Sequence, residues 1–115
     1  NFKVLKFLCY NPHCGEDGTL GNQDKFISQI LNENFKSILG PLPADSAFKN
    51  YDKNTLFIST YHDQALIPFK ILNKKGFNLT LGLNYLRLSP AHGTALDIKY
   101  KNQSIIESYL ACMLS

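Results

Sequence analysis

The sequence predicts an α/β protein in which a sheet is covered by helices. Strand-like apolar runs alternate along the chain with segments whose apolar residues recur at helical spacing. The first of these runs, Phe2–Cys9, is apolar enough for a strand buried on both faces, with Lys3 and Lys6 as interruptions. The chain has 115 residues, of which 44% are hydrophobic. That is enough for one domain or for part of one.

The first half of the chain predicts one long helix after this strand. A loop rich in glycine follows Cys9, and Asn22 is suited to cap a helix that runs to about residue 36. The segment Gly40–Pro43 is expected to break any regular element. A short helical turn, capped by Asp45 or Ser46, is expected to reach Phe48.

The second half predicts three strands and two helices. The expected strands are Thr55–Thr60, Phe77–Leu81 and Tyr85–Leu88, and the expected helices are Asp63–Leu72 and Ser104–Leu114. Because proline lacks a backbone N–H, Pro68 must lie in the first turn of its helix or break it.

Composition excludes some classes of protein and partner. The net charge is +3, and the 12 Lys and Arg residues are scattered, so nucleic-acid binding is not indicated. The sequence has no signal peptide and no apolar run of about 18 residues, so no membrane span is expected. The chain opens almost directly in a strand and without Met, as a fragment would.

The three cysteines, Cys9, Cys14 and Cys112, are odd in number and form no CxxC motif. We interpret them as free thiols in a reducing compartment. A free cysteine can be reactive, but the simpler interpretation is that each of the three serves as a small buried apolar residue.

Two histidines stand just past predicted strand ends, where open α/β sheets bind ligands. His13 lies in the segment Asn11–Glu16, and His62 begins a segment that is mostly apolar and reaches Lys70. The two histidines can converge on one metal or one anion, because neutral imidazole is a common metal ligand. The alternative is that each ring is merely hydrogen-bonded in a cap or a loop.

Polar residues within apolar segments are further candidates for binding an anion. Lys70, Asn78 and Arg87 have this setting, and Arg suits a bidentate grip on phosphate or carboxylate. For Arg87 a salt bridge to Asp or Glu within the protein is equally well supported.

Two glycine-containing segments predict turns. Gly15, Gly18 and Gly21 are spaced as a loop before the first helix, and we interpret them as turn-forming residues rather than a phosphate cradle. The segment His92–Ala95 can present backbone N–H groups to a nucleotide, although a simple turn is the default interpretation.

Five segments together closely resemble the C-terminal part of the 4-hydroxythreonine-4-phosphate dehydrogenase family, and they occur in the family's order. These segments are Asn11–Glu16 (NPHCGE), Gly40–Asp45 (GPLPAD), Tyr61–Gln64 (YHDQ), Asn78–Leu83 (NLTLGL) and His92–Ala95 (HGTA). The resemblance implies that residues 1–115 are the C-terminal portion of a larger two-domain α/β/α dehydrogenase. Its fold would be a mixed sheet with helices on both faces.

The resemblance also implies a reaction. The family oxidises 4-phosphohydroxy-L-threonine with NAD, and decarboxylation then leaves 3-amino-2-oxopropyl phosphate, on the route to pyridoxal phosphate (vitamin B6). NADP in place of NAD stays open, as does the choice of Zn, Co or Mg as the divalent metal. A homodimer in the cytoplasm is expected.

Individual positions match the family's functional residues. His13 and His62 match two of three metal-binding histidines, and the third belongs to a segment outside this sequence. Lys70, Asn78 and Arg87 match residues that bind the substrate, whereas His92, Gly93, Thr94 and Ala95 resemble a cofactor loop in related dehydrogenases.

Several positions depart from the family pattern, among them Asn84, where Pro is usual, and Leu88 and Ala91, where polar residues are common. Cys14 stands where Ala is usual, and Lys99–Asn102 replaces a glycine-rich continuation after Asp97. Two other functions remain open from the residues alone: a small metal- or anion-binding domain without redox activity, and a dimerisation module.

Overall fold

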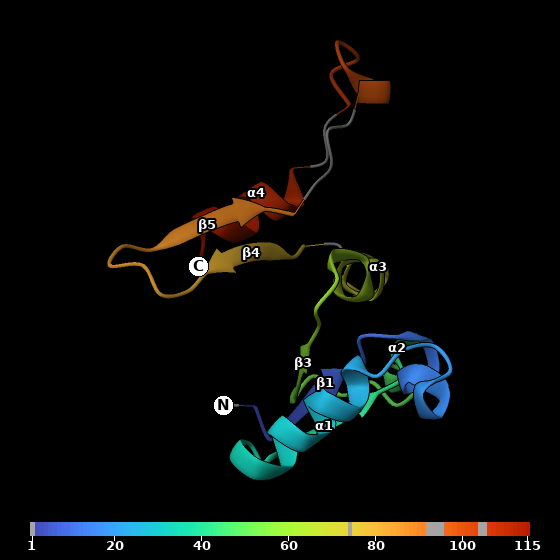
Figure 1. Ribbon diagram of the computed structural model, residues 1–115. Coiled ribbons are helices and arrows are strands. Elements are labelled where there is room, and N and C mark those ends of the chain that lie inside the picture. Colours follow the sequence, from blue (N-terminus) through green and yellow to red (C-terminus); the bar gives the residue numbers. More distant parts are fainter. Residues whose placement is uncertain (1, 74, 92–95, 104–105) are drawn as a thin grey trace. The chain divides into compact units, whose positions relative to one another are not determined.

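The computed structural model describes residues 2–73, 75–91, 96–103 and 106–115. The chain divides into two compact units, Asn1–Pro68 (unit 1) and Phe69–Ser115 (unit 2). The division falls inside helix α3 (His62–Leu72), so this helix contributes residues to both units (Figure 1).

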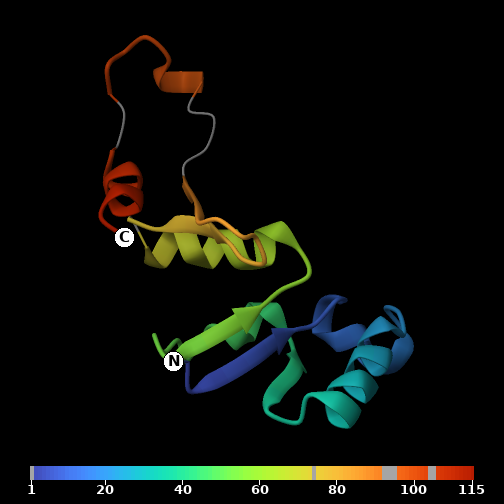
Figure 2. The same cartoon turned by 90° about the vertical axis from the view of Figure 1, so that its left-hand side faces the viewer.

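Unit 1 is built on a parallel sheet of three strands. The strands are β1 (Val4–Leu8), β2 (Ile38–Leu42) and β3 (Thr55–Ile58), in the order β2-β1-β3. The central strand β1 pairs with both neighbours, since Leu5 lies opposite Ile38 on one side and Leu56 on the other. Figure 2 shows β1 and β3 side by side.

Both faces of this sheet are covered, as expected for the predicted class. Helix α1 (Gln23–Asn34) packs over the face that carries Phe7 and Ile58, around an apolar cavity of about 310 Å³. On the opposite face, Phe48 stacks on Phe57 with ring centroids 4.3 Å apart. Phe48 ends the short helix α2 (Ala44–Ala47), which is the helical turn predicted from the sequence.

Strand β2 corrects one expectation, because Gly40–Pro43 does not break all regular structure. The strand runs through Gly40 and Pro41 at the edge of the sheet, where proline is tolerated, and the pairing with β1 shifts register between Lys6 and Leu8. Gly40 has φ +146°, and a Cβ there would lie 2.5 Å from the carbonyl oxygen of Phe7. Glycine is therefore required for the close approach of the two strands.

Helix α3 corrects a second expectation. Pro68 lies in the interior of this helix rather than in its first turn, and the helix continues to Leu72. A proline inside a helix removes one N–H and crowds the carbonyl four residues earlier, here that of Gln64. The helix tolerates this local loss and does not end.

Unit 2 is an antiparallel hairpin with one packed helix. Strand β4 (Phe77–Thr80) pairs with β5 (Arg87–Pro90), and helix α4 (Glu107–Met113) contacts both strands. A short 3₁₀ turn, η2 (Leu96–Ile98), lies between β5 and α4 in the sequence. Helix α4 is shorter than the predicted Ser104–Leu114, and residues 104 and 105 lie outside the described residues.

The described core lies almost entirely in unit 1. Its buried apolar residues are Leu8, Cys9, Leu31 and Ala47, whereas Ser108 is the one described residue of unit 2 that is buried. The α/β class predicted from the sequence is confirmed, with both parallel and antiparallel pairing present. Among the helices described, none has the length and apolar character needed to cross a membrane.

Candidate functional site

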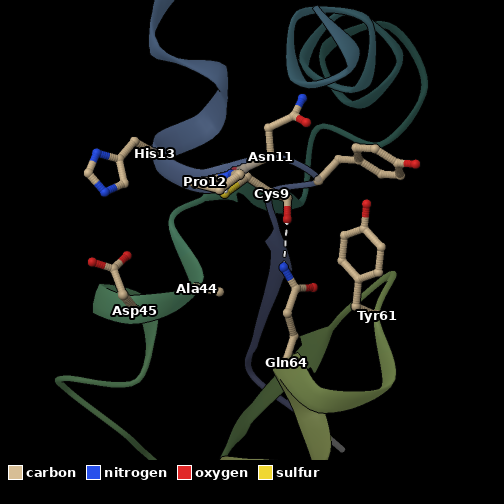
Figure 3. Close-up of a pocket in the computed structure, with 9 residues that line it drawn as sticks. Cys9, Asn11, Pro12, His13, Ala44, Asp45, Tyr61 and Gln64 are labelled. Atoms are coloured by element: carbon tan, nitrogen blue, oxygen red, sulfur yellow. Dashed lines mark hydrogen bonds between the residues drawn. The ribbon is translucent and has the colours of Figure 1, made fainter. Parts of the chain in front are cut away.

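A pocket of about 510 Å³ lies at the carboxyl ends of the three parallel strands of unit 1 (Figure 3). Its walls come from the segment after β1, the start of α2 after β2, and the turn after β3; the lining residues are Cys9, Tyr10, Asn11, Pro12, His13, Ala44, Asp45, Tyr61 and Gln64. The connections from β1 lead to α1 on one face and from β2 to α2 on the other. Ligands of open α/β sheets bind at such a reversal.

The segment after β1 is fixed by a buried carboxylate on α1. Asp24 is 2% exposed, and its two carboxylate oxygens accept hydrogen bonds from the backbone N–H groups of Tyr10 (2.6 Å) and Asn11 (2.8 Å). The N–H of Cys9 donates to the carbonyl of Leu42 at 2.8 Å. Because these contacts come from two different elements, the path of the chain toward His13 is tightly determined.

His13 itself lies in a tight left-handed turn, η1 (Pro12–Gly18). Four non-glycine residues of this turn have positive φ: His13, Cys14, Glu16 and Asp17. Such conformations are unfavourable for L-residues and persist where surrounding contacts enforce them, often at functional sites. Gly15, Gly18 and Gly21 also have positive φ, which confirms their predicted turn-forming role.

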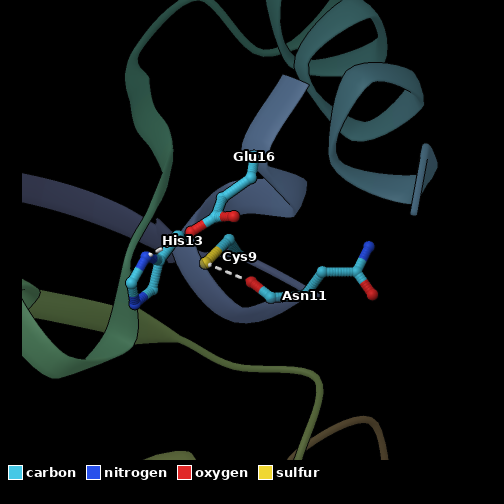
Figure 4. A network of polar contacts seen from close by, with 4 residues as sticks. All are labelled: Cys9, Asn11, His13 and Glu16. Carbon is cyan, nitrogen blue, oxygen red and sulfur yellow. Dashed lines mark hydrogen bonds and ion pairs between the residues drawn. The ribbon is translucent and has the colours of Figure 1, made fainter. Parts of the chain in front are cut away.

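The His13 side chain contacts a carboxylate through one ring nitrogen. Its Nδ1 lies 2.9 Å from Oε1 of Glu16, and the side chain is exposed (Figure 4). Close by, Cys9 Sγ donates to the carbonyl of Asn11 at 3.0 Å. A carboxylate on Nδ1 orients the ring and leaves Nε2 as the nitrogen that can bind a metal.

His62 has the same arrangement at the start of α3. Its Nδ1 lies 2.8 Å from Oδ1 of Asp63, and both side chains are exposed. His62 does not line the pocket, but its neighbours Tyr61 and Gln64 do. The structure therefore brings the two histidine-bearing segments to one pocket, with His13 in its wall and His62 beside it.

This donor set fits a divalent metal in part. Each of the two imidazoles has a carboxylate on Nδ1, which is the usual environment of a metal-binding histidine. Within the described ranges, no three His, Cys, Asp or Glu side chains are grouped closely enough to hold a metal ion. A catalytic metal usually has three protein ligands, so these two histidines would need a further one.

Two direct contacts join the histidine-bearing segments. The rings of Tyr10 and Tyr61 lie with centroids 5.1 Å apart, and Gln64 Nε2 donates to the carbonyl of Cys9 at 2.8 Å. A hydrogen bond with Tyr10, followed by desolvation, raises the pKa of Tyr61 to about 12. The shift moves ionisation of the Tyr61 hydroxyl still further above neutral pH.

The cysteines are free thiols in the structure. Cys9 is buried as expected, whereas Cys14 and Cys112 are only partly buried. Burial, followed by the contact with Cys9, raises the pKa of the Cys14 thiol to about 12. Raising the pKa lowers the fraction of thiolate, the form in which a thiol acts as a nucleophile.

The three predicted substrate-binding residues lie on elements of unit 2. Lys70, Asn78 and Arg87 are all exposed, on α3, β4 and β5 respectively. Thr80 pairs with Arg87 across the hairpin, so Asn78, two residues before Thr80, lies on the same face as Arg87. Arg87 Nη1 donates to Thr80 Oγ1 at 3.0 Å.

The alternative of a structural salt bridge for Arg87 finds no support, because no carboxylate pairs with it among the residues that the structure describes. Its guanidinium is exposed and, within the described residues, donates to a hydroxyl rather than to a carboxylate. The predicted cofactor residues His92, Gly93, Thr94 and Ala95 lie outside the described residues.

Sequence reasoning missed several residues that line the pocket or hold its walls in place. Asp24 could have been found as an acidic residue in the first turn of a helix that follows a glycine-rich loop, a position that favours bonds to backbone N–H groups. Asp45 was singled out as a possible helix cap and as part of the segment Gly40–Asp45, but not as a residue of the site, although it faces the pocket on the same side as His13 (Figure 3). No sequence signal predicts the contact between Tyr10 and Tyr61.

Comparison with known proteins connects this geometry to one family. The family model described as "Pyridoxal phosphate biosynthetic protein PdxA" matches residues 4–114. A 4-hydroxythreonine-4-phosphate dehydrogenase of Hydrogenobaculum is 45% identical over 107 residues, covering 91% of this chain and 34% of its own. The Helicobacter pylori protein of that name is 42% identical, covering 94% of this chain and 38% of its own.

Solved structures agree with this result. The 4-hydroxythreonine-4-phosphate dehydrogenase of Klebsiella pneumoniae matches with a TM-score of 0.64 and 30% identity, over 94% of this chain and 36% of that one. The chain thus spans about a third of the length of the relatives that it matches. Because the family model covers nearly all of its residues, the chain belongs to the PdxA family of pyridoxal phosphate biosynthetic proteins.

Proposed function

We propose that this chain contributes metal and substrate ligands to an NAD-dependent 4-hydroxythreonine-4-phosphate dehydrogenase. The reaction is the oxidation and decarboxylation of 4-phosphohydroxy-L-threonine to 3-amino-2-oxopropyl phosphate in pyridoxal phosphate biosynthesis. One observation carries the proposal: His13 lines a pocket at the strand ends, in a strained turn, with Nδ1 held by Glu16 and Nε2 left for a metal.

In this proposal His13 and His62 bind a divalent metal through Nε2, and Glu16 and Asp63 hold the two rings in orientation. Zn²⁺ and Co²⁺ suit imidazole ligands better than Mg²⁺ does. When bound, such a metal supplies Lewis-acid chemistry that lowers the pKa of a substrate hydroxyl. The nicotinamide supplies the hydride acceptor.

Lys70, Asn78 and Arg87 bind the anionic groups of the substrate in this proposal. Lys70 and Arg87 each provide a positive charge, and Asn78 provides an amide on the same face of the hairpin as Arg87. Their exposure in the structure supports this role, because each side chain is free to reach a ligand.

We further propose that residues 1–115 work as the C-terminal portion of a two-domain enzyme that forms a homodimer in the cytoplasm. The coverage of about a third of each relative supports this. The third metal ligand would come from outside this chain. His92–Ala95 as a cofactor loop stays a prediction, which native NAD affinity in a folded Gly93→Val enzyme would contradict.

The metal proposal is tested with His13→Ala and His62→Ala in the full-length enzyme. We expect both variants to lose bound metal and turnover, measured by elemental analysis and by NADH absorbance. His92→Ala is the control for metal content alone: it removes the remaining histidine, which is predicted to lie in the cofactor loop, and it should keep the metal. Unchanged metal content in both variants would rule out these two ligands.

A second test uses the 115-residue chain by itself. With two of three metal-binding histidines and without the rest of the cofactor cleft, it should form no NADH from 4-phosphohydroxy-L-threonine, NAD and divalent metal. Turnover close to that of a full-length relative would show that the chain is a complete enzyme.

A further inference from the structure

Gln64 is the pocket residue whose contacts are least explained by folding alone. It lies in the first turn of α3, two residues after His62, and its Nε2 donates to the carbonyl of Cys9 at 2.8 Å. Because a carbonyl can only accept, this bond fixes which way the amide points. The Oε1 atom is then buried and has no partner among the described residues.

A buried acceptor without a partner is unfavourable, typically by about 1–3 kcal/mol. An apolar side chain of similar size would avoid this penalty at position 64. Groups that break the rule of polar satisfaction in this way concentrate at functional sites, where another demand overrides stability. We therefore infer that the amide at position 64 has a functional role.

The bond from Gln64 joins the two histidine-bearing segments at a well-fixed point. Its acceptor, Cys9, is 1% exposed and precedes His13 by four residues. Asp24 holds the next two backbone N–H groups from the opposite side, through α1. Through Gln64, the helical turn that carries His62 is tied to this rigid segment.

We propose that Gln64 is a positioning residue that sets the position of His62 relative to His13 and thereby tunes metal affinity. This proposal rests on the proposed function, since it takes the two histidines as metal ligands. Gln64 does not touch the metal. Residues that support metal ligands in this way typically change affinity or activity 10–100-fold when they are replaced.

The test is a Co²⁺ titration of the metal-free full-length protein, followed by the visible absorption of the bound ion. Gln64→Leu removes the bond to Cys9 and also the unpartnered oxygen, so the thermal midpoint of the metal-free protein should change little. Co²⁺ affinity should fall about 10–100-fold, with an altered absorption spectrum. Gln64→Glu, which keeps the shape but loses the donor, should act alike if the Leu variant does not fold.

Gln29→Leu is the matched control, because Gln29 donates to Glu33 on the exposed side of α1 and does not line the pocket. It should keep wild-type affinity. His13→Ala separates the two proposals: Co²⁺ binding that survives this change overturns the metal site and the positioning role with it. Binding that depends on His13 but is equally tight in Gln64→Leu and Gln64→Glu overturns the positioning role alone.

Discussion

The two units of this chain differ in how far each one completes its own core. Unit 1 buries Leu8 completely and covers both faces of its sheet, and it carries His13 and His62, the two predicted metal ligands. Both units leave large apolar side chains exposed, such as Phe26 at 65% in unit 1 and Leu86 at 73% in unit 2, but no apolar residue described in unit 2 is buried. The predicted metal ligands thus belong to the unit that contains nearly all of the described buried residues, whereas the predicted substrate ligands Asn78 and Arg87 lie on a hairpin packed against one helix.

The largest expected effect is on the stability of unit 1. Leu8→Ala should destabilise the 115-residue protein by about 2–5 kcal/mol, because it leaves a cavity at a fully buried position. The matched change in unit 2, Leu86→Ala, should stay within about 0.5 kcal/mol. Urea denaturation measures both, and equal losses would abolish the contrast between the units.

The next largest effect distinguishes substrate binding, proposed for unit 2, from metal binding, proposed for unit 1. Arg87→Ala in unit 2 should weaken binding of the phosphorylated substrate by about 1.5–3 kcal/mol, through loss of a charge-assisted bond. KM should rise while bound metal stays at the wild-type level. Steady-state kinetics with metal analysis on the same full-length sample decides this, and an unaltered KM would make Arg87 a structural residue.

Two glycines with positive φ give a smaller and directly matched comparison. Gly40→Ala in unit 1 should lower the free energy of unfolding by about 1–3 kcal/mol. The alanine would have to adopt a positive φ, and its Cβ would collide with the carbonyl oxygen of Phe7. Gly82→Ala in unit 2 should cost only about 1 kcal/mol, since φ is +84° but nothing lies within 4 Å of the new atom. Thermal unfolding of both variants tests whether the steric clash at Gly40 adds to the cost of a positive φ, which both positions share.

The smallest effect at neutral pH concerns Cys14. Its folded-state pKa of about 12 lies above the ordinary value of 9.0, so the unfolded chain releases this proton first as pH rises. The stabilising contribution is complete below pH 9 and is lost progressively above it. Cys14→Ala should therefore flatten the decline of stability between pH 8 and pH 10.5, and an identical decline in both proteins would contradict the shift.

The sequence predicted most of unit 1 because local patterns and packing agree there. The strands near Val4–Leu8 and Thr55–Ile58 and the helix near Gln23–Asn34 all follow from apolar spacing. Strand β2 was missed because Gly40 and Pro41 are local signals for a break, and only the approach of Phe7 explains them. Tertiary contact overrode local propensity at that point.

The residues of the candidate site could also be predicted only in part from the sequence. The settings of His13 and His62 after strand ends are local features, so both could be singled out from the sequence. Asp24 and Gln64 act through bonds to backbone groups 13 to 55 residues away, and spacing contains no information on such contacts. The positions of Asn78 and Arg87 on one face required the register of the hairpin.

The most direct test of the proposed metal site is a crystal structure of the full-length enzyme. The crystals are grown in the presence of Zn²⁺, and diffraction data are collected at the zinc absorption edge. We predict an anomalous peak about 2.0–2.1 Å from Nε2 of both His13 and His62, with Glu16 and Asp63 still on the Nδ1 atoms. A peak bound by neither histidine, or full turnover in crystals whose histidines bind no metal, would contradict the proposal.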